Sequence, residues 1–183
     1  MIEGVMEYSD NKKELYEEVV LQLKGLFEDC PHEIANLANA SAVLWQAMKD
    51  INWVGFYRME LCEGHDSAKA MEGNMHTKED GREERLILGP FQGKPACVEI
   101  KVGKGVCGTA VEKDEIQLVK NVHEFPGHIA CDSASNSEIV LPIHKDGKVW
   151  GVLDIDSPLI GRFDEEDRDG LVQVVHVIEE MLR

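Results

Sequence analysis

The hydrophobic period of this chain changes near residue 50, and that change restricts its fold more than any other feature. Before it, apolar side chains recur at helical spacing in two runs that Pro31 separates. From Asn52 the period becomes two, which predicts a strand after two amphipathic helices. The two helical runs comprise Tyr16, Val19, Val20, Leu23, Leu26 and Phe27, and then Ile34, Leu37, Ala38, Ser41, Ala42, Trp45 and Met48.

The predicted first strand has two aromatic residues on one face and one on the other. Trp53 and Tyr57 share one face with Gly55, whereas Val54 and Phe56 occupy the other. One side of this strand therefore offers two large aromatic side chains that carry a polar atom.

The rest of the chain has the pattern of strands joined mostly by hairpins and closed by a helix. Asp146-Gly147 between the last two strands is a strong hairpin signal. Asp164 is the expected N-cap of the final helix, which has acidic residues in its first turn. This order indicates an α+β fold, an antiparallel sheet with helices packed on it, rather than a doubly wound parallel sheet. The expected strands cover 86–91, 98–102, 116–119, 139–144 and 149–156, with a short helix over 105–111.

Length and composition fit one compact domain over residues 1–183. The chain has a hydrophobic fraction of 43%, which is enough to build a core. The two predicted helices fall within residues 1–50. Residues 60–85 are rich in charge and glycine without a sustained period, so we expect a long polar insert loop there.

Charge restricts the partners of this protein. A formal net charge of −16 repels nucleic acids and anionic membrane surfaces at long range. No apolar run approaches the roughly 20 residues that span a bilayer. The acidic start of the chain also lacks the basic segment of a secretory signal. We therefore expect a soluble, cytoplasmic protein.

The cysteines are odd in number, which argues against a static disulfide framework in a chain without a secretory signal. The sequence contains no Cys-x-x-Cys pair, and this weakens both a structural zinc site and a thioredoxin-like site. Catalytic or bystander thiols remain as interpretations. The cysteines are Cys30, Cys62, Cys97, Cys107 and Cys131.

The segment from Gly103 to Gly108 matches the Gly-x-Gly-x-x-Gly pattern of dinucleotide sites. Such a site needs a βαβ unit whose next parallel strand carries an acid, and the strand pattern disfavours that unit. The alternative is a tight turn that places Cys107 near a helix N-terminus. The helix dipole would then lower the pKa of this thiol and favour the thiolate.

Cys131 lies in a polar coil, residues 127–138, which has few side chains able to build a core. A structural thiol is more typical of an apolar strand or helix, so we predict a functional role for Cys131. Cys97 and Cys107 have small or apolar neighbours, and for each of them packing and function fit the pattern equally well.

A metal site is an alternative use of the same three thiols, with His123 or His128 as a further ligand. The close ligand pairs that are usual in zinc sites are missing, which disfavours this interpretation. The ordinary expectation for both histidines is a loop position with hydrogen-bond partners.

Asp154 and Asp156 alternate with Leu153 and Ile155, so both carboxylates point to one face of a strand. A solvent-facing strand would explain this pattern. If the face instead closes a pocket near Glu138, mutual repulsion would raise the pKa of at least one carboxyl group. Such a cluster would bind an ammonium group and donate a proton.

These residues together resemble the motifs of the free methionine-(R)-sulfoxide reductases, which are GAF-domain enzymes. The resemblance runs from about Asn52 to the end of the chain and includes the spacing of three cysteines and the acidic strand. The long acidic insert after Tyr57 departs from the family pattern. The motifs are NWVGFY at 52–57, LGPFQG at 88–93, AC at 96–97, GKGVCGT at 103–109, the coil and strand at 127–141, GVLDID at 151–156 and GRF at 161–163.

The resemblance implies a six-stranded antiparallel sheet flanked by helices, assembled as a homodimer. It implies that free L-methionine (R)-S-oxide is reduced by cysteine thiols, with thioredoxin as the reductant and with no metal or bound cofactor. By similarity, Cys131 is the nucleophile, Cys97 its resolving partner and Cys107 the third thiol, although which of Cys107 and Cys131 attacks first stays open. The implied substrate-binding residues are Trp53 and Tyr57 around the methyl sulfoxide, and Glu138, Asp154 and Asp156 at the amino group and the sulfoxide oxygen.

The same fold also occurs in sensors that bind small molecules without catalysis, so fold alone does not decide the function. A sensor needs an output domain or a signalling helix, and we expect none here because the final helix stops at Arg183.

Overall fold

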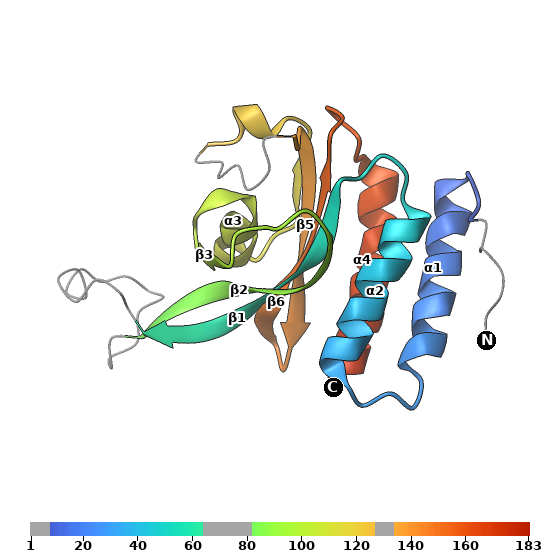
Figure 1. The fold of residues 1–183 in the computed structure, drawn as a ribbon, viewed down its shortest axis with the longest axis horizontal. Coiled ribbons are helices and arrows are strands. Elements are labelled where there is room, and N and C mark those ends of the chain that lie inside the picture. The colour runs from blue at the N-terminus through green and yellow to red at the C-terminus, as the bar shows by residue number, and fades with distance from the viewer. Residues whose placement is uncertain (1–7, 64–81, 127–133) are drawn as a thin grey trace.

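The fold is built around a sheet that has helices on both of its faces (Figure 1). The computed structural model describes residues 8–63, 82–126 and 134–183. The predicted α+β class is confirmed. One face of the sheet is covered by α2 (Glu33–Ala47) and α4 (Glu165–Leu182), with α1 (Lys12–Phe27) packed on these two helices, and the other face by α3 (Gly105–Lys113).

The sheet has six strands in the order β3-β2-β1-β6-β5-β4, and all neighbouring strands are antiparallel. The predicted hairpin between the last two strands is present, since Asp146 and Gly147 have φ values of 53° and 72°. A short 3-10 helix, η1 (Val122–Glu124), follows β4. The strands are β1 (Trp53–Glu63), β2 (Arg82–Gly93), β3 (Glu99–Lys101), β4 (Gln117–Val119), β5 (Ser137–Lys145) and β6 (Lys148–Ser157).

Alternation along β1 divides the core between the two faces of the sheet, as predicted. Val54 and Phe56 pack in the larger cluster with the residues of α1, α2 and α4. Trp53 and Tyr57 belong to a smaller cluster on the side of α3. None of these four side chains is more than 4% exposed. The smaller cluster therefore supplies the apolar surroundings of whatever lies beneath α3.

The buried face of α2 differs from the predicted one. Ile34 is 65% exposed and Trp45 is 39% exposed, although helical spacing assigns both to the buried stripe. Alanines lie on several sides of this helix, so more than one stripe fits its sequence. Packing against α1, β1 and β2 selects the one that is buried. The observed face consists of Asn36, Leu37, Ala40, Ser41, Val43, Leu44 and Ala47.

The predicted insert loop over 60–85 is too long at both ends. Residues 60–63 belong to β1 and residues 82–85 belong to β2, paired from Glu60 with Arg85 to Glu63 with Arg82. This part of the hairpin extends beyond the core, so its strands are polar and lack an apolar alternation. Residues 64–81 of the predicted loop lie outside the described residues.

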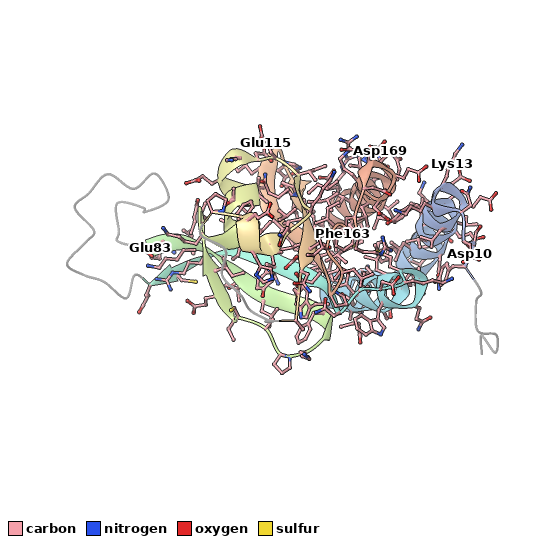
Figure 2. The ribbon with its side chains drawn as sticks, turned by 90° about the horizontal axis from the view of Figure 1, so that it is seen from above. Asp10, Lys13, Glu83, Glu115, Phe163 and Asp169 are labelled. Atoms are coloured by element: carbon pink, nitrogen blue, oxygen red, sulfur yellow. The ribbon has the colours of Figure 1, made fainter. Side chains whose placement is uncertain are left out.

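The closing helix α4 begins after Asp164, as predicted. The Asp164 carboxylate accepts hydrogen bonds from the N–H groups of Glu166 and Asp167, and the Asp167 carboxylate accepts one from the Asp164 N–H. The Tyr16 hydroxyl also donates to Asp167 at 2.8 Å, which ties α1 to α4. Figure 2 shows Phe163 inside the molecule, just before this helix. Among the described residues, no helix is both long and apolar enough to cross a membrane.

Candidate active site

A pocket opens on the face of the sheet that α3 covers. Residues of β1, β5 and β6 contribute to it from the sheet, and α3 and the segment after β2 contribute from above. Six of the eight residues predicted for the site line this pocket. The full lining comprises Trp53, Tyr57, Lys94, Pro95, Ala96, Ile100, Lys104, Gly105, Val106, Cys107, Ser135, Glu138, Asp154 and Asp156.

Strand register explains why three acids meet in this pocket. Asp154 and Asp156 are two residues apart on β6, so their side chains point to the same face. Glu138 on β5 pairs with Asp156, and Trp53 on β1 pairs with it from the other side. Glu138 and Asp154 are each 6% exposed, so this face closes a pocket instead of facing open solvent.

The glycine-rich segment forms the tight turn that was predicted before α3. Gly103 and Gly105 have positive φ values of 76° and 62°, which residues with a side chain rarely adopt. Gly108 allows close packing, since a Cβ atom there would lie 2.4 Å from the Lys101 carbonyl oxygen. The sheet of the described residues is antiparallel and contains no βαβ unit for a dinucleotide. The turn instead places Cys107 in the first turn of α3.

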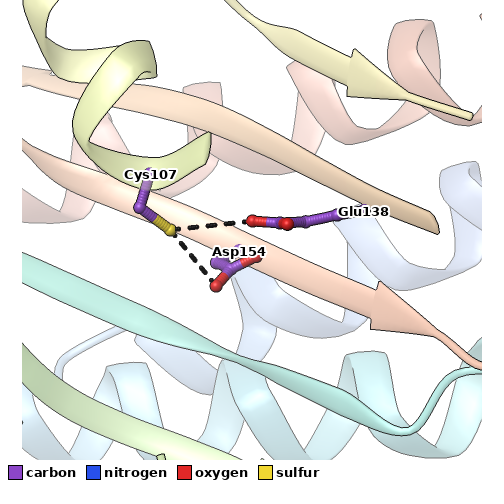
Figure 3. Close-up of side chains that lie close together, drawn as sticks. All are labelled: Cys107, Glu138 and Asp154. Carbon is purple, nitrogen blue, oxygen red and sulfur yellow. Dashed lines mark hydrogen bonds between the residues drawn. The ribbon is translucent and has the colours of Figure 1, made fainter. Parts of the chain in front are cut away.

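Cys107 faces two of the acids directly. Its Sγ atom lies 3.2 Å from Oδ2 of Asp154 and 4.0 Å from Oε1 of Glu138 (Figure 3). The thiol is buried, with 3% of the residue exposed. Because carboxylates only accept hydrogen bonds, a protonated thiol is the donor in these contacts.

The expected lowering of the Cys107 pKa is wrong. Burial, followed by the charges of Asp154 and Glu138, raises the pKa of this thiol well above its usual value. A helix N-terminus offers only about half a unit of positive charge, which does not offset complete desolvation together with two neighbouring acids. In the resting site Cys107 is therefore a thiol and not a thiolate.

The acids themselves hold protons, as predicted for carboxyl groups that crowd in a pocket. Burial raises the pKa of Asp154 to about 7. Burial, the charges of Asp154 and Asp156, and a hydrogen bond with Asp154 raise the pKa of Glu138 well above its usual value. Glu138 and Asp154 thus share a hydrogen bond in which one of them retains a proton near neutral pH. A protonated carboxyl group that lines a pocket can act as a general acid toward a bound substrate.

The aromatic residues of β1 line the pocket and also hold its rim. Trp53 stacks on Tyr57 at a centroid distance of 5.9 Å and on Phe91 at 5.3 Å. The Trp53 indole N–H donates to the Lys94 carbonyl at 3.1 Å, and the Tyr57 hydroxyl donates to the Cys97 carbonyl at 3.0 Å. These two hydrogen bonds fix the segment between β2 and β3 against the sheet.

Sequence reasoning missed three polar residues of the pocket. Lys94 and Lys104 each follow a glycine in the sequence and belong to no periodic pattern. Ser135 is 5% exposed, and its Oγ atom accepts a hydrogen bond from Asn52 Nδ2 at 3.1 Å. A signal for Ser135 exists, since it belongs to the polar coil that also contains Cys131.

One group of described residues offers metal-ligand atoms at close range. The ligand atoms of Cys107, Glu138 and Asp154 all lie within 4.8 Å of one another. This group differs from the metal site considered from the sequence. His123 is exposed on η1, and His128 lies outside the described residues.

Known proteins resemble this chain over nearly its whole length. The GAF domain family matches residues 24–182. A free methionine-R-sulfoxide reductase of Escherichia coli (strain K12) is 45% identical, over 94% of this chain and 91% of the relative. The chain belongs to the free methionine-R-sulfoxide reductase family. A structure of fRMsr of Staphylococcus aureus in the reduced form is 48% identical, with a TM-score of 0.77 over 92% of this chain and 95% of that one. The free methionine-R-sulfoxide reductase from Neisseria meningitidis, solved in complex with its substrate, is 38% identical, with a TM-score of 0.79 over 97% and 94% of the two chains.

The cysteines of this member of the free methionine-R-sulfoxide reductase family lie at different distances from the pocket. Cys107 lines it, and half-buried Cys97 lies in the segment after β2 whose preceding residues line it. Cys131 lies outside the described residues. Cys30 follows α1 and Cys62 is near the end of β1, and neither lines the pocket.

Proposed function

We propose that this protein reduces free L-methionine (R)-S-oxide to methionine by cysteine thiol chemistry, with thioredoxin as the reductant. The observation that carries the proposal is the pocket in which a buried pair of acids that retains a proton faces two aromatic side chains and a thiol. Family membership supports the same reaction. We further propose that the protein acts in the cytoplasm as a homodimer, the assembly that the family resemblance favours.

The pocket chemistry matches the parts of a free amino acid with a sulfoxide. Glu138, Asp154 and Asp156 carry the charge that an α-ammonium group needs, and Asp154 Oδ1 is a buried acceptor without a partner among the described residues. Lys94 and Lys104 line the same pocket and suit an α-carboxylate. A methionine within a peptide has neither charge, so it lacks the two groups that these side chains would bind.

The aromatic wall suits the apolar end of the substrate. Trp53 and Tyr57 are stacked and almost completely buried, which makes them a rigid surface for the S-methyl group. Such a wall keeps water away from the reacting sulfur.

The reaction balances as two coupled two-electron changes. A thiolate attacks the sulfoxide sulfur while a protonated carboxyl group delivers a proton to the oxygen. The hydroxyl group then moves from the substrate sulfur to the cysteine sulfur as the new S–S bond breaks, so methionine leaves and the cysteine becomes a sulfenic acid. A second cysteine thiol condenses with the sulfenic acid, which forms a disulfide and releases water. Two thiols of reduced thioredoxin return the disulfide to two cysteines and become a disulfide themselves.

The surroundings of the thiols support different roles for them. The raised pKa of Cys107 makes it a poor attacking group and supports Cys131 as the nucleophile. Cys97 is half-buried beside the pocket, which suits a resolving thiol that must also be reached by a reductant. Cys107 is the third thiol of the site, held as a hydrogen-bond donor to the acids.

The test mixes the reduced protein with free methionine (R)-S-oxide, a thioredoxin system and NADPH, and follows the loss of NADPH. The (S) epimer and a peptide that contains methionine sulfoxide are the matched controls. We expect turnover with the free (R) epimer alone. Stabilisation of the protein by the (R) epimer without turnover would contradict the proposal and favour a sensor that binds small molecules.

A further inference from the structure

Cys107, Glu138 and Asp154 have the geometry of a small cation site. They come from three separate elements, α3, β5 and β6, and their side chains converge in Figure 3. The Cys107 Sγ atom is 3.2 Å from Asp154 Oδ2 and 4.0 Å from Glu138 Oε1. A tetrahedral zinc ion with Zn–S of about 2.3 Å and Zn–O of about 2.0 Å separates its sulfur and oxygen ligands by about 3.5 Å. The two observed distances bracket this separation.

Asp154 provides an independent sign that this cluster takes a ligand. Asp154 is only 6% exposed, and its Oδ1 atom has no hydrogen-bond partner among the described residues. Neither Glu138 nor Asp154 forms an ion pair with a lysine or arginine in the described part of the chain. A buried carboxylate without a counter-charge is costly, and a bound cation removes that cost.

The ligand set selects among cations. A thiolate is a soft ligand that magnesium and calcium do not favour, whereas zinc accepts sulfur together with carboxylate oxygen. Three protein ligands also leave one tetrahedral position, which the lining of the pocket makes accessible to water.

We propose that Cys107, Glu138 and Asp154 bind a Zn²⁺ ion, and that zinc at this position inhibits the protein reversibly. As the metal–ligand bonds form, the Cys107 thiol and the protonated carboxyl group release their protons to solvent. The bound ion is ligated by the same carboxylates that the substrate ammonium group would contact, so zinc and substrate compete for the pocket. The inhibition rests on the proposed reductase function, whereas the binding does not.

Binding is tested without substrate on the metal-free, fully reduced protein. Zn²⁺ is titrated in competition with a chromogenic chelator for the wild type, Cys107→Ser and Asp154→Asn. The matched control is the double variant Cys97→Ser/Cys131→Ser, which keeps the three ligands and removes the other two thiols predicted for the site. We expect the double variant to bind one zinc ion as tightly as the wild type, and each ligand variant to bind at least about tenfold more weakly.

A spectroscopic probe separates the intended site from the remaining thiols. Cd²⁺ bound to a thiolate gives an ultraviolet charge-transfer band, which we expect in the double variant and not in Cys107→Ser. Thermal unfolding with and without Zn²⁺ shows that each variant is folded. Asp154→Asn keeps the test decisive if Cys107→Ser unfolds. Unchanged zinc affinity in both ligand variants, or loss of binding in the double variant, would overturn the proposal.

Inhibition is measured separately on the wild type. We expect Zn²⁺ to raise the KM for the (R)-sulfoxide without changing kcat, and a chelator to restore activity. Tight binding at the cluster with no inhibition would overturn the inhibitory role. If no preparation turned over the sulfoxide, the proposed function would fail while the binding result stood.

Discussion

The Sγ atom of Cys107 lies 3.2 Å from Oδ2 of Asp154, although the two residues are 47 positions apart in the sequence. The contact joins the first turn of α3 to the middle of β6, one of the two central strands. It converts a cysteine at a helix N-terminus, where a thiolate would be stable, into a buried hydrogen-bond donor. The chemistry of this site therefore depends on how the acids and the thiol share protons.

Replacing Glu138 by glutamine should reduce catalysis strongly. Glutamine has nearly the same shape but no acidic proton to deliver to the sulfoxide oxygen, so kcat/KM should fall by about 10²–10⁴-fold. The measurement is steady-state reduction of the free (R)-sulfoxide, with circular dichroism to verify the fold. Glu115→Gln, at an exposed position, is the control and should keep wild-type activity. Equal activity of both variants would exclude Glu138 as the proton donor.

Replacing Cys131 by serine should abolish methionine formation even in a single turnover, because Cys107, the thiol that lines the pocket, is buried and has a raised pKa, which makes it a poor substitute for the attacking group. The amount of methionine formed per chain without added thioredoxin is the quantity to measure. Cys30→Ser is a suitable control, since Cys30 does not line the pocket. Full activity of Cys131→Ser would instead make Cys107 the nucleophile.

The Cys107 thiol should react with iodoacetamide more slowly than the half-buried Cys30 thiol near neutral pH. Burial and the neighbouring acids keep Cys107 protonated, and only a thiolate is alkylated rapidly. Asp154→Asn removes one of the negative charges and should accelerate the modification. Mass spectrometry of peptides gives the rate for each cysteine, and Asp146→Asn in the β5–β6 turn is the control. No acceleration in Asp154→Asn would mean that Asp154 does not raise the pKa of Cys107.

His144 should stabilise the fold more in acid than in base. Burial lowers the pKa of His144, but hydrogen bonds to Asp114 at 2.7 Å and to Glu179 at 3.0 Å outweigh it and raise the pKa. A raised folded pKa means that the contribution is complete below the unfolded pKa of about 6.5 and disappears as the pH rises through the folded value.

The comparison for His144 is wild type against His144→Gln in urea unfolding at about pH 5.5 and about pH 8.5. The wild type should be more stable than the variant by up to about 1 kcal/mol at the lower pH, because the side chain is partly exposed. This advantage should shrink at the higher pH. An advantage that grew with pH would contradict the ion-pair account.

Gly108→Ala should destabilise the fold by about 1–3 kcal/mol. Its new Cβ atom would lie 2.4 Å from the Lys101 carbonyl oxygen, so α3 must move away from β3 and take Cys107 with it. Gly25→Ala is the matched control, since a Cβ atom on this glycine of α1 meets nothing within 4 Å. The control should stabilise the protein by about 0.5–1 kcal/mol. Urea unfolding of both variants is the measurement, and equal effects would refute the close approach.

Local patterns in the sequence are enough to predict the order of the helices and strands, and the face of the sheet to which each strand residue points. The period of two assigned Trp53 and Tyr57 to one side of β1, and the structure confirms it because side chains of a strand must alternate. The same geometry put Asp154 and Asp156 on one face. Capping chemistry located the start of α4 at Asp164. Each of these features depends on residues within a few positions of one another.

Sequence patterns predict the wrong structure where they fit more than one local structure equally well. Helical spacing predicts that Ile34 and Trp45 of α2 are buried, but both are exposed, because alanines allow more than one buried face and packing against neighbouring elements selects one of them. The sequence beyond Glu60 predicts a loop, but its first residues continue the β1–β2 hairpin, because strand pairing outside the core needs no apolar alternation. Pairing partners far along the chain decide such cases.

The sequence by itself therefore determined the order of the elements, the strand faces and the types of side chain available for chemistry, since these follow from short-range geometry. Only the tertiary structure decided which side chains meet and in which protonation state. Cys107 shows the difference most clearly. Its helix position favours a low pKa, but burial against Asp154 and Glu138 raises the pKa, because desolvation and charges brought together by the sheet exceed the effect of one helix end.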